Sequence, residues 1–390
     1  MKKRICFLTD SIFSVGGVQR VTAVIAKELA KEHDITIVTF DASEMQDTTL
    51  YGLDEVDITY CFFCYPAVGK LRNLACKAYS AFYKTMRPSG RLFSDLYARS
   101  SFPAPRRKAL ARLLTEGSFD VIIGVHAPLA ARLASLRPLL NKDVRCIGWI
   151  HNSFEALFGP TSLYIGPVLK RHYVCQLKKL DKTVVLCQHD ADSYYTYDAT
   201  FRTTVIYNPL TLVPGTPSKG NTKRFLAVGR FSHLHKGFDL LIDTMRHLRE
   251  LDPTLADRLH LLLYGELRDP SLLQQLKVGY THLGYITDIN SVFRQAHIVL
   301  STSRYESFGY TLLEGMASGC IPVSTGAGGQ ADIVKHLHNG YLTGSNDPAD
   351  VARGIAWAAQ APLSRHAQHQ WVADHFDAQF IAQQYLNLFV

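Results

Sequence analysis

Residues 297–323, HIVLSTSRYESFGYTLLEGMASGCIPV, hold the pattern from which the fold can be predicted. His297–Thr302 is an apolar run of strand length, a helical segment covers residues 311–317, and a second apolar run begins at residue 320. A strand, a helix and a strand in this order are the unit of an open parallel sheet. Ligands of such sheets bind at the carboxyl ends of the strands, beside helix N-termini. We therefore expect the connection between strand and helix to contact a ligand.

Two carboxylates flank this connection. Glu306 follows the strand, and Glu314 lies one to two turns into the helix. This spacing places Glu306 near the reacting part of a ligand and Glu314 about one helical turn further along it. The backbone amides of Ser307, Phe308 and Gly309 lie between the two carboxylates, where they face the same ligand.

The composition is that of a globular protein with two domains of ordinary size. The chain has 390 residues, of which 47% are hydrophobic and 19% are charged, so it is neither disordered nor built of membrane spans. No apolar run reaches the roughly eighteen residues of a spanning helix, and the N-terminus does not resemble a signal peptide. The cysteines lie in apolar surroundings, as is typical of a reducing compartment. These features predict a cytoplasmic protein.

The cysteine and histidine patterns give little support to metal chemistry. Cys61 and Cys64 have a metal-like spacing, but no second Cys pair and no His pair at zinc spacing accompanies them. The sixteen histidines form no HExxH motif. We expect no metal ion and no other cofactor.

Strand-like and helix-like segments alternate along the whole chain, which indicates parallel, doubly wound sheets. The stretch TLVPGTPSKGNTK, which follows Leu210, interrupts this alternation and is typical of a linker. We predict an N-terminal Rossmann-like domain over residues 1–208 and a C-terminal Rossmann-like domain over residues 209–374, facing each other across a cleft. A helix over about residues 375–390 is expected to pack back on the first domain.

Two loops outside the opening stretch are candidate phosphate sites. Gly16 and Gly17 stand where the first strand meets the first helix, so the backbone can approach a ligand closely there, although such a pair also occurs in simple tight turns. Arg230 and Lys236 follow a later strand just ahead of a helix. An Arg binds a diphosphate bidentately and a Lys adds a point charge, while the alternative is a pair of surface charges.

The positive charge of the chain is concentrated in one segment. The formal net charge is +8, and residues 66–112 hold eleven Lys or Arg against the single acid Asp95. Leu, Phe and Tyr residues are interleaved with these charges, which favours a helix that lies on an anionic bilayer surface. A solvated basic face or a surface for nucleic acid remains the alternative, but no nucleic-acid-binding motif accompanies the segment.

Several motifs, taken in order, resemble those of family 4 retaining glycosyltransferases of the GT-B fold. The resemblance covers nearly the whole chain and is strongest from Phe225 to Leu342. The stretch HNSF after Ile150 is similar to bacterial members that build surface polysaccharides. The motifs that carry the resemblance are Gly16-Gly17, His151, Gly229-Arg230, Lys236, Gly265-Glu266, Glu306 with Glu314, and Ala327-Gly328-Gly329.

The resemblance implies roles for the charged residues of the second half. Arg230 and Lys236 would hold the diphosphate of a sugar nucleotide and stabilise the charge that grows on it as the sugar departs. Glu314 would accept hydrogen bonds from the ribose hydroxyls. Glu306, together with the amides of Phe308 and Gly309, would hold the hydroxyls of the donor sugar.

Further roles implied by the resemblance concern the base and the first domain. The backbone near Gly265, Tyr285 and Ile286 would meet the base. The Gly17 amide would contact the phosphates, and His151 would face the donor sugar.

The sequence also departs from the family pattern at two places. The family turn carries a Glu after its glycines, where this chain has Gln330, and Asp332 is a shorter candidate replacement. The loop at Gly265 lacks the usual Gly-x-Gly.

The resemblance implies a retaining transfer of a hexose or N-acetylhexosamine from a nucleotide sugar, expected to be a UDP-sugar, without a metal ion. The expected acceptor is a glycan or a polyprenyl-diphosphate-linked glycan of bacterial surface polysaccharide synthesis, at the inner face of the cytoplasmic membrane. Whether Glu306 is a nucleophile or a ligand of the sugar stays open. The alternatives are a sugar-nucleotide epimerase of the same architecture, a GDP-mannose-dependent mannosyltransferase, and a nucleic-acid-binding protein.

Overall fold

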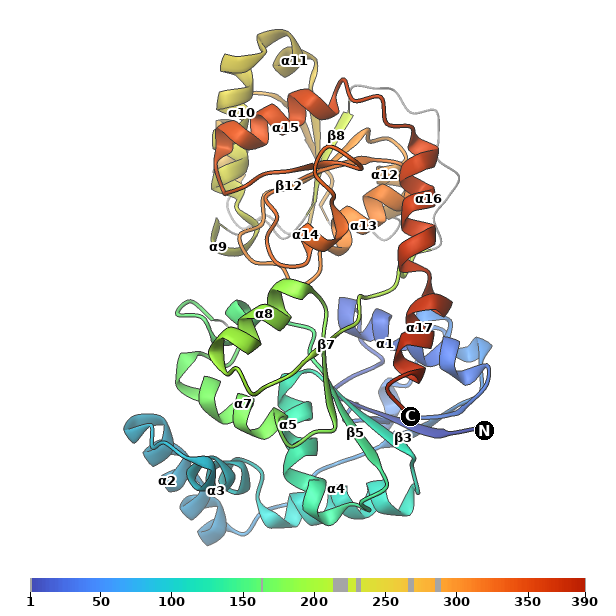
Figure 1. Ribbon diagram of the computed structural model, residues 1–390, viewed down its shortest axis with the longest axis vertical. Helices are drawn as coiled ribbons and strands as arrows, with labels where there is room; N and C mark the ends of the chain where they lie inside the picture. Colours follow the sequence, from blue (N-terminus) through green and yellow to red (C-terminus); the bar gives the residue numbers. More distant parts are fainter. Residues whose placement is uncertain are drawn as a thin grey trace. The chain divides into compact units, whose positions relative to one another are not determined.

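The computed structural model describes residues 2–162, 164–212, 224–228, 233–265, 270–284 and 289–389 (Figure 1). The chain divides into two compact units. The first comprises residues 1–186, 190–211 and 378–390, and the second comprises residues 187–189 and 212–377. The chain thus passes to the second unit after residue 211, where the sequence predicted a boundary after residue 208, and its last residues belong to the first unit.

The first unit is built on a seven-stranded sheet in which every paired strand is parallel. The strand order is β3-β2-β1-β4-β5-β6-β7, so the order reverses between β1 and β4, where ligands of doubly wound sheets bind. The strands are β1 (Arg4–Thr9), β2 (Asp34–Thr39), β3 (Ile58–Phe62), β4 (Val121–Val125), β5 (Arg145–Trp149), β6 (Lys182–Val185) and β7 (Thr204–Val205).

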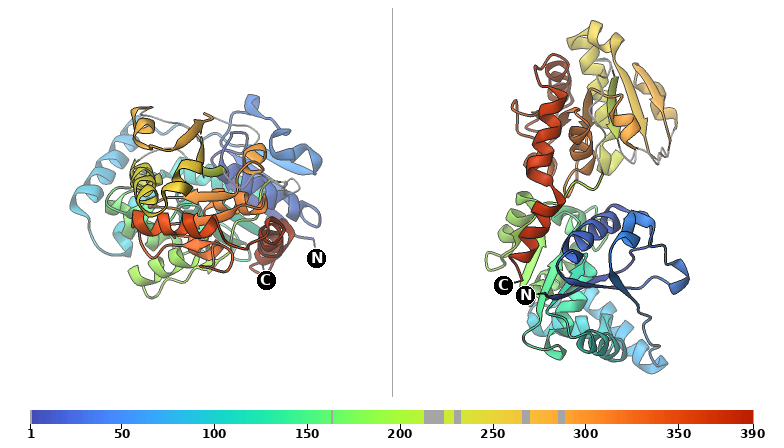
Figure 2. Two further views of the ribbon diagram at one scale, coloured as in Figure 1. Left: turned by 90° about the horizontal axis from the view of Figure 1, so that it is seen from above. Right: turned by 90° about the vertical axis from the view of Figure 1, so that its right-hand side faces the viewer.

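Helices cover the sheet of the first unit, and one of them comes from the end of the chain. That helix, α17, packs against α1, as the two views of Figure 2 show, and Tyr385 on α17 lies against Trp149 with ring centroids 5.2 Å apart. The helices are α1 (Gly17–Ala30), α2 (Lys70–Met86), α3 (Arg91–Ser101), α4 (Ala104–Glu116), α5 (Ala127–Leu136), α6 (Phe154–Phe158), α7 (Lys170–Leu177), α8 (Gln188–Tyr197) and α17 (Ala378–Leu386).

The second unit repeats this design with a six-stranded parallel sheet in the order β10-β9-β8-β11-β12-β13. Its strands are β8 (Arg224–Val228), β9 (His260–Tyr264), β10 (Gly279–His282), β11 (Ile298–Ser301), β12 (Ile321–Ser324) and β13 (Tyr341–Leu342). Its helices are α9 (His233–Lys236), α10 (Phe238–Leu251), α11 (Pro253–Arg258), α12 (Ile289–Phe293), α13 (Tyr310–Ala317), α14 (Gln330–Ile333), α15 (Pro348–Ala358) and α16 (Arg365–Phe376).

Two helical segments of the second unit are short. Residues Pro270–Gln275 form a 3-10 helix, and α14 ends at Ile333. Short amphipathic segments carry too little intrinsic helical stability to set their own length, so their packing decides where they end.

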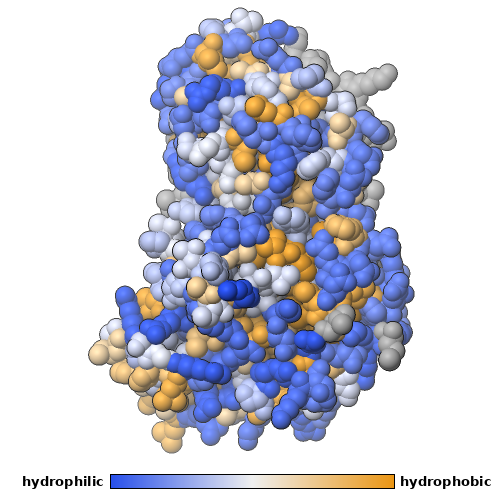
Figure 3. Space-filling view, viewed as in Figure 1, coloured by the Kyte–Doolittle hydropathy of each residue, from blue (hydrophilic) through white to orange (hydrophobic). Residues whose placement is uncertain are grey.

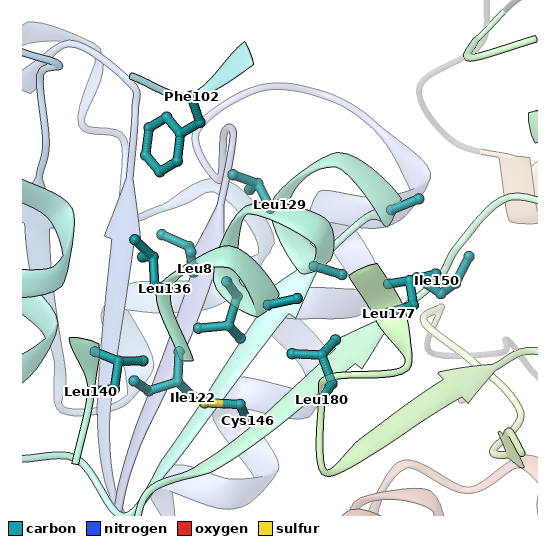
Figure 4. Packing of buried hydrophobic residues seen from close by; sticks show 14 of the residues in the cluster. Leu8, Phe102, Ile122, Leu129, Leu136, Leu140, Cys146, Ile150, Leu177 and Leu180 are labelled. Carbon is teal, nitrogen blue, oxygen red and sulfur yellow. The ribbon is translucent and has the colours of Figure 1, made fainter. Parts of the chain in front are cut away.

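Each sheet has its own apolar core. In the first unit Leu8 and Ile122 on strands pack with Leu129 and Leu177 on helices, and all four side chains are fully buried (Figure 4). A Cβ on Gly124 would lie 3.0 Å from the Ala130 Cα, so helix α5 sits directly on strand β4. Burying one such side chain contributes about 1.5–3 kcal/mol. These cores hold the carboxyl ends of the strands rigidly in place.

Within the described ranges, every helix is too short or too polar to cross a bilayer.

Candidate active site

An ion pair joins two loops of the second unit that are seventy residues apart in the sequence. The Lys236 Nζ lies 2.6 Å from the Glu306 Oε2, and the two side chains are 30% and 19% exposed. The Thr302 hydroxyl donates to the Lys236 carbonyl at 3.0 Å, and the Arg304 N–H donates to the His235 carbonyl at 2.9 Å. Because β8 and β11 are neighbours in the sheet, the loops at their carboxyl ends form one site.

A glycine and a second ion pair fix the position of Lys236. Gly237 has a φ of +61°, and a Cβ on it would lie 2.1 Å from the Thr302 carbonyl oxygen. Only glycine therefore allows this close approach. Arg304 binds Asp239 bidentately at 2.8 and 2.6 Å, and this hydrogen bonding lowers the pKa of Asp239 below its usual value.

The other sequence-predicted residues of the second unit lie around the start of α13. Gly309 precedes the helix with a φ of +106°. Glu314 is on the helix and only 5% exposed. The Phe308 ring is 2% exposed and contacts the rings of Tyr310 and Phe376, with centroids 5.4 and 5.9 Å away. The Phe308 side chain thus belongs to the core, and only the backbone of Phe308 can contact a ligand.

The turn that carries Gly328 and Gly329 packs against the backbone of the Glu306 loop. A Cβ on Gly328, whose φ is +53°, would lie 1.7 Å from the Glu306 carbonyl oxygen. A Cβ on Gly329 would lie 2.8 Å from the Ser307 carbonyl oxygen. The two glycines let this turn pack against the backbone of the predicted ligand-binding loop.

Gln330, at the position of the family glutamate, is buried in a polar cluster. Its Oε1 accepts from the Ser324 hydroxyl at 2.7 Å, and its Nε2 donates to the Ser301 hydroxyl at 2.6 Å, so it links β12 to β11. Asp332 accepts a hydrogen bond from the Gln188 N–H at 2.8 Å. That Asp332 takes the place of the family glutamate toward a ligand stays a prediction.

In the first unit, His151 follows β5 and is almost completely buried. Its ring lies 4.3 Å from that of Trp149 and 5.4 Å from that of His126, measured between centroids. Among the described residues its Nε2 has no hydrogen-bond partner. Burial lowers the pKa of His151 well below its usual value, and the neighbouring His126 lowers it further. His151 is therefore a neutral imidazole at physiological pH.

His126 is a second histidine at this edge of the sheet, which the sequence analysis did not identify. It follows β4, the neighbour of β5, and has a φ of +72°. Burial lowers its pKa, against the opposing effect of the Asp10 carboxylate. His126 directly follows a buried strand and His151 follows another by two residues, so a histidine at the end of an apolar run is a signal that could have identified His126.

The loop that leads to Gly16 and Gly17 is held in place by polar contacts. The Gly16 N–H donates to the Tyr51 hydroxyl at 2.9 Å, and the buried Asp41 carboxylate accepts from the Ile12 N–H at 2.8 Å. A Cβ on Gly17 would meet no other atom within 4 Å. The N-terminus of α1 thus borders open space, where its free N–H groups can reach a ligand.

The remaining predicted base-binding residues are only partly described. Gly265 has a φ of +115°, and its N–H donates to the Gly284 carbonyl at 2.7 Å, which connects the loops after β9 and β10. Outside the described residues lie Gly229, Arg230, Glu266, Leu267, Tyr285 and Ile286.

The structure gathers part of the predicted site in each unit. Lys236 and Glu306 are in direct contact in the second unit, with Ser307–Gly309 and Glu314 following along the same connection, whereas Gly16, Gly17 and His151 lie in the first unit. The ligand-binding roles of these residues stay predictions. In the described part of the chain no three His, Cys, Asp or Glu side chains gather as they would around a metal ion.

Two family models match this chain and together cover most of it. Residues 15–212 match the model described as Glycosyltransferase Family 4. Residues 212–372 match the model described as Glycosyl transferases group 1. The two matches meet where the chain passes from one unit to the other.

One curated relative and two solved structures illustrate the similarity. The mannosylfructose-phosphate synthase of Agrobacterium fabrum is 40% identical over 143 residues, which are 33% of this chain and 31% of that protein, so the chain spans about a third of that relative. The lipopolysaccharide outer core galactosyltransferase WaaB has a TM-score of 0.69 and 16% identity, over 99% of this chain and 98% of that one. Anabaena Alr3699/HepE in complex with UDP has a TM-score of 0.71 and 21% identity, over 99% of both chains. These structures share the fold of this chain over its whole length.

Proposed function

This chain belongs to glycosyltransferase family 4 and has the GT-B fold that its sequence predicted, and we propose that it is a retaining glycosyltransferase that uses a nucleotide sugar. Family membership favours sugar transfer over the epimerase alternative.

The observation that carries this proposal is the 2.6 Å ion pair between Lys236 and Glu306, with Glu314 further along the same connection. A diphosphate carries more negative charge than one carboxylate, so when it enters the site it replaces Glu306 as the partner of Lys236. Lys236 then stabilises the charge that develops on the departing nucleoside diphosphate, together with Arg230. Glu306, released from the lysine, accepts hydrogen bonds from hydroxyls of the donor sugar, and Glu314 accepts them from the ribose.

We propose a same-face reaction. The bond between the anomeric carbon and the diphosphate oxygen breaks, the acceptor hydroxyl oxygen bonds to the same face of that carbon, and its proton passes to the departing phosphate. A double displacement would instead need a carboxylate directly beneath the anomeric carbon. Glu306 is the candidate for that carboxylate, but its pairing with Lys236 favours the ligand-holding role. Product NMR tests the proposal, because an inverted anomeric configuration would refute retention.

The proposed donor is a UDP-sugar that carries a hexose or an N-acetylhexosamine. Support comes from the similar Anabaena protein, whose structure contains UDP. A second candidate is a GDP-mannose-dependent mannosyltransferase, and the similarity to a mannosylfructose-phosphate synthase over a third of the chain favours it. Thermal-shift measurements with UDP-, GDP- and ADP-sugars decide between them, because a ligand that binds only the folded state raises its melting temperature. Turnover with the preferred donor should persist in EDTA, since we propose that no metal takes part.

The proposed acceptor is a glycan or a polyprenyl-diphosphate-linked glycan of bacterial surface polysaccharide synthesis, presented at the inner face of the cytoplasmic membrane. The basic segment 66–112 supports this location, because it forms helices α2 to α4 with several exposed apolar side chains. Flotation with liposomes of neutral and of anionic lipid tests the membrane part of the proposal. Binding that ignores lipid charge, or retention on nucleic acid instead, would contradict it.

A further inference from the structure

The loop between β1 and α1, residues 10–16, is held in its first half by a buried carboxylate. Asp41 follows β2 by two residues, and its Oδ2 accepts from the Ile12 N–H at 2.8 Å and from the Phe13 N–H at 3.2 Å. The side chains of Ile12 and Phe13 are buried as well. The interior of the first unit thus fixes the first half of the loop.

The second half of the loop, which leads into α1, has no such anchor in the core. Val15 is 73% exposed, and a Cβ on Gly17 would meet no other atom within 4 Å. Gly16 and Gly17 have no side chains to restrict their own backbone, so this stretch by itself would sample many conformations. A contact from another part of the chain must therefore decide its conformation.

That contact is the hydroxyl of Tyr51. It accepts a hydrogen bond from the Gly16 N–H at 2.9 Å and donates to the Ser14 carbonyl at 3.1 Å, with the Gly16 carbonyl 3.3 Å away as a second acceptor. The Gly16 carbonyl also accepts from the Arg20 N–H at 3.1 Å, the first hydrogen bond of α1. One phenol thus bonds the backbone on both sides of Val15, where the loop becomes a helix.

Tyr51 reaches the loop from a strained backbone. Its φ of +62° and ψ of +15° are left-handed, a conformation that costs free energy in residues other than glycine. Such strain persists only where the surroundings hold the residue in place, and it occurs preferentially at functional sites. The strained position of Tyr51 is therefore a sign that its side chain has a specific task.

The turn around Tyr51 is connected to α1 a second time. Lys27 on α1 donates to the Tyr51 carbonyl at 3.4 Å and pairs with Glu55 at 2.5 Å. Of the residues Leu50–Glu55 only Leu53 is buried. Polar contacts therefore hold this turn, in contrast to the exposed hydrophobic patches over α2 and α3 at the lower left of Figure 3.

Tyr60 is a second tyrosine that contacts the same loop, but through its ring. The Tyr60 ring lies 5.2 Å from that of Phe13, measured between centroids. Its hydroxyl is buried and has no hydrogen-bond partner among the described residues. The two tyrosines thus offer a matched pair, in which only the Tyr51 hydroxyl bonds the loop.

We propose that Tyr51 is a positioning residue of the donor site, whose hydroxyl holds Gly16 and Gly17 in the conformation that presents the Gly17 N–H to the diphosphate of the nucleotide sugar. The inference rests on the proposed function and on the predicted contact of the Gly17 amide with the donor phosphates. The hydroxyl occupies the Gly16 N–H itself, so it directs the ligand to the amides that follow. Ordering the loop before the donor arrives lowers the entropy cost of binding.

The first test makes the same chemical change at the two tyrosines. Tyr51→Phe removes the hydroxyl that bonds Ser14 and Gly16, whereas Tyr60→Phe removes a hydroxyl without a described partner. One such hydrogen bond is worth about fivefold in affinity, so we expect the donor KM to rise about fivefold in Tyr51→Phe and less than about twofold in Tyr60→Phe. In both variants kcat should stay within about twofold, because the bound donor orders the loop again.

A second variant separates the hydroxyl from the backbone strain. Tyr51→Asn accepts the left-handed conformation more readily, but its side chain is too short to replace the hydroxyl at the loop. We expect the same rise in donor KM as in Tyr51→Phe. A donor KM like that of the unmodified protein would assign the effect to strain and overturn the role of the hydroxyl.

Hydrogen exchange tests the positioning without any ligand. The Tyr51 hydroxyl protects the Gly16 amide, so the peptide over residues 13–20 should exchange faster in Tyr51→Phe, as measured by mass spectrometry. Exchange of the same peptide should stay unchanged in Tyr60→Phe. Unchanged exchange in Tyr51→Phe would overturn the positioning role whatever the kinetics.

The kinetic outcomes also separate this inference from the proposed function. A donor KM that Tyr51→Phe raises no more than Tyr60→Phe does would overturn the inference alone, provided that Gly17→Ala still raises it. If neither Tyr51→Phe nor Gly17→Ala changes the donor KM, the contact of α1 with the donor is refuted, and the inference falls with it.

Discussion

The carboxyl edges of the two sheets carry different chemistry. In the second unit the edge is charged, with Lys236 paired to Glu306 and Arg304 paired to Asp239. In the first unit the candidate residue His151 is buried and its imidazole is neutral. Two sheets of the same architecture thus carry a charged, ion-paired edge in the second unit and a buried, neutral histidine at the edge of the first.

Solvent exposure explains the difference. Lys236 keeps 30% of its side chain exposed and pairs with the Glu306 carboxylate at 2.6 Å. His151 is only 5% exposed and has an aromatic neighbour in Trp149, so protonating it would place a charge in an apolar setting. A cation without a counter-charge would be stable at the sheet edge of the first unit only if the site opened to water or bound an anion.

The charged edge should show the largest effect. Lys236→Ala removes the cation that we propose to face the departing diphosphate, and we expect turnover to fall about 10²–10³-fold, because one such donor is worth about 3–4 kcal/mol. Steady-state kinetics with the preferred donor measures the change. Lys335→Ala, an exposed lysine of the same unit, is the control. Turnover within a few-fold of the unmodified enzyme would remove Lys236 from the catalytic set.

The proposed contact of Glu314 with the ribose should show the next largest effect. Glu314→Gln keeps the shape of a side chain that is 5% exposed but removes its charge. Hydrogen bonds to a charged group contribute about 1.5–3 kcal/mol, so kcat/KM should fall about 10–100-fold. We expect the loss to be smaller with a donor analogue that lacks the ribose 2′-hydroxyl. An equal loss with both donors would contradict the ribose role.

Acid should destabilise the first unit. Burial lowers the pKa of His172 to about 4 in the folded protein. The unfolded state therefore binds a proton as the pH falls below about 6.5, whereas the folded state does not until about pH 4. Stability is therefore complete above pH 6.5 and falls as the pH decreases toward 4, by about 2 kcal/mol at pH 5 from this residue. Urea unfolding at pH 7.5 and 5 measures the loss, which should be smaller by that amount in His172→Gln. The same loss in the variant would contradict the assignment.

Two glycine substitutions should separate binding from stability. Gly17→Ala places a methyl group in open space, so we expect an unchanged melting temperature and a donor KM raised about fivefold, as for a loss of about 1 kcal/mol. Gly328→Ala would bring a Cβ to 1.7 Å from the Glu306 carbonyl oxygen, so we expect a lowered melting temperature. A donor KM that Gly17→Ala leaves unchanged would remove the N-terminus of α1 from the donor site.

The sequence predicted the strand and helix around Glu306 and Glu314 because hydrophobic period and turn residues are local properties. It did not predict that Asp239 would hold Arg304, or that Gln330 would join β11 to β12, although these contacts shape the same loop. Ion pairs and buried polar clusters depend on which distant residues the sheet brings together, and single-sequence periodicity contains no such information.

The order of elements, the two-unit division and the candidate residues for diphosphate binding follow from the sequence alone, since each rests on local hydrophobic pattern and side-chain chemistry. The tertiary structure decided the burial of His151 and the contact of Lys236 with Glu306. Burial, pairing and cavities are properties of a packed interior, and they exist only once segments far apart in the chain have come together.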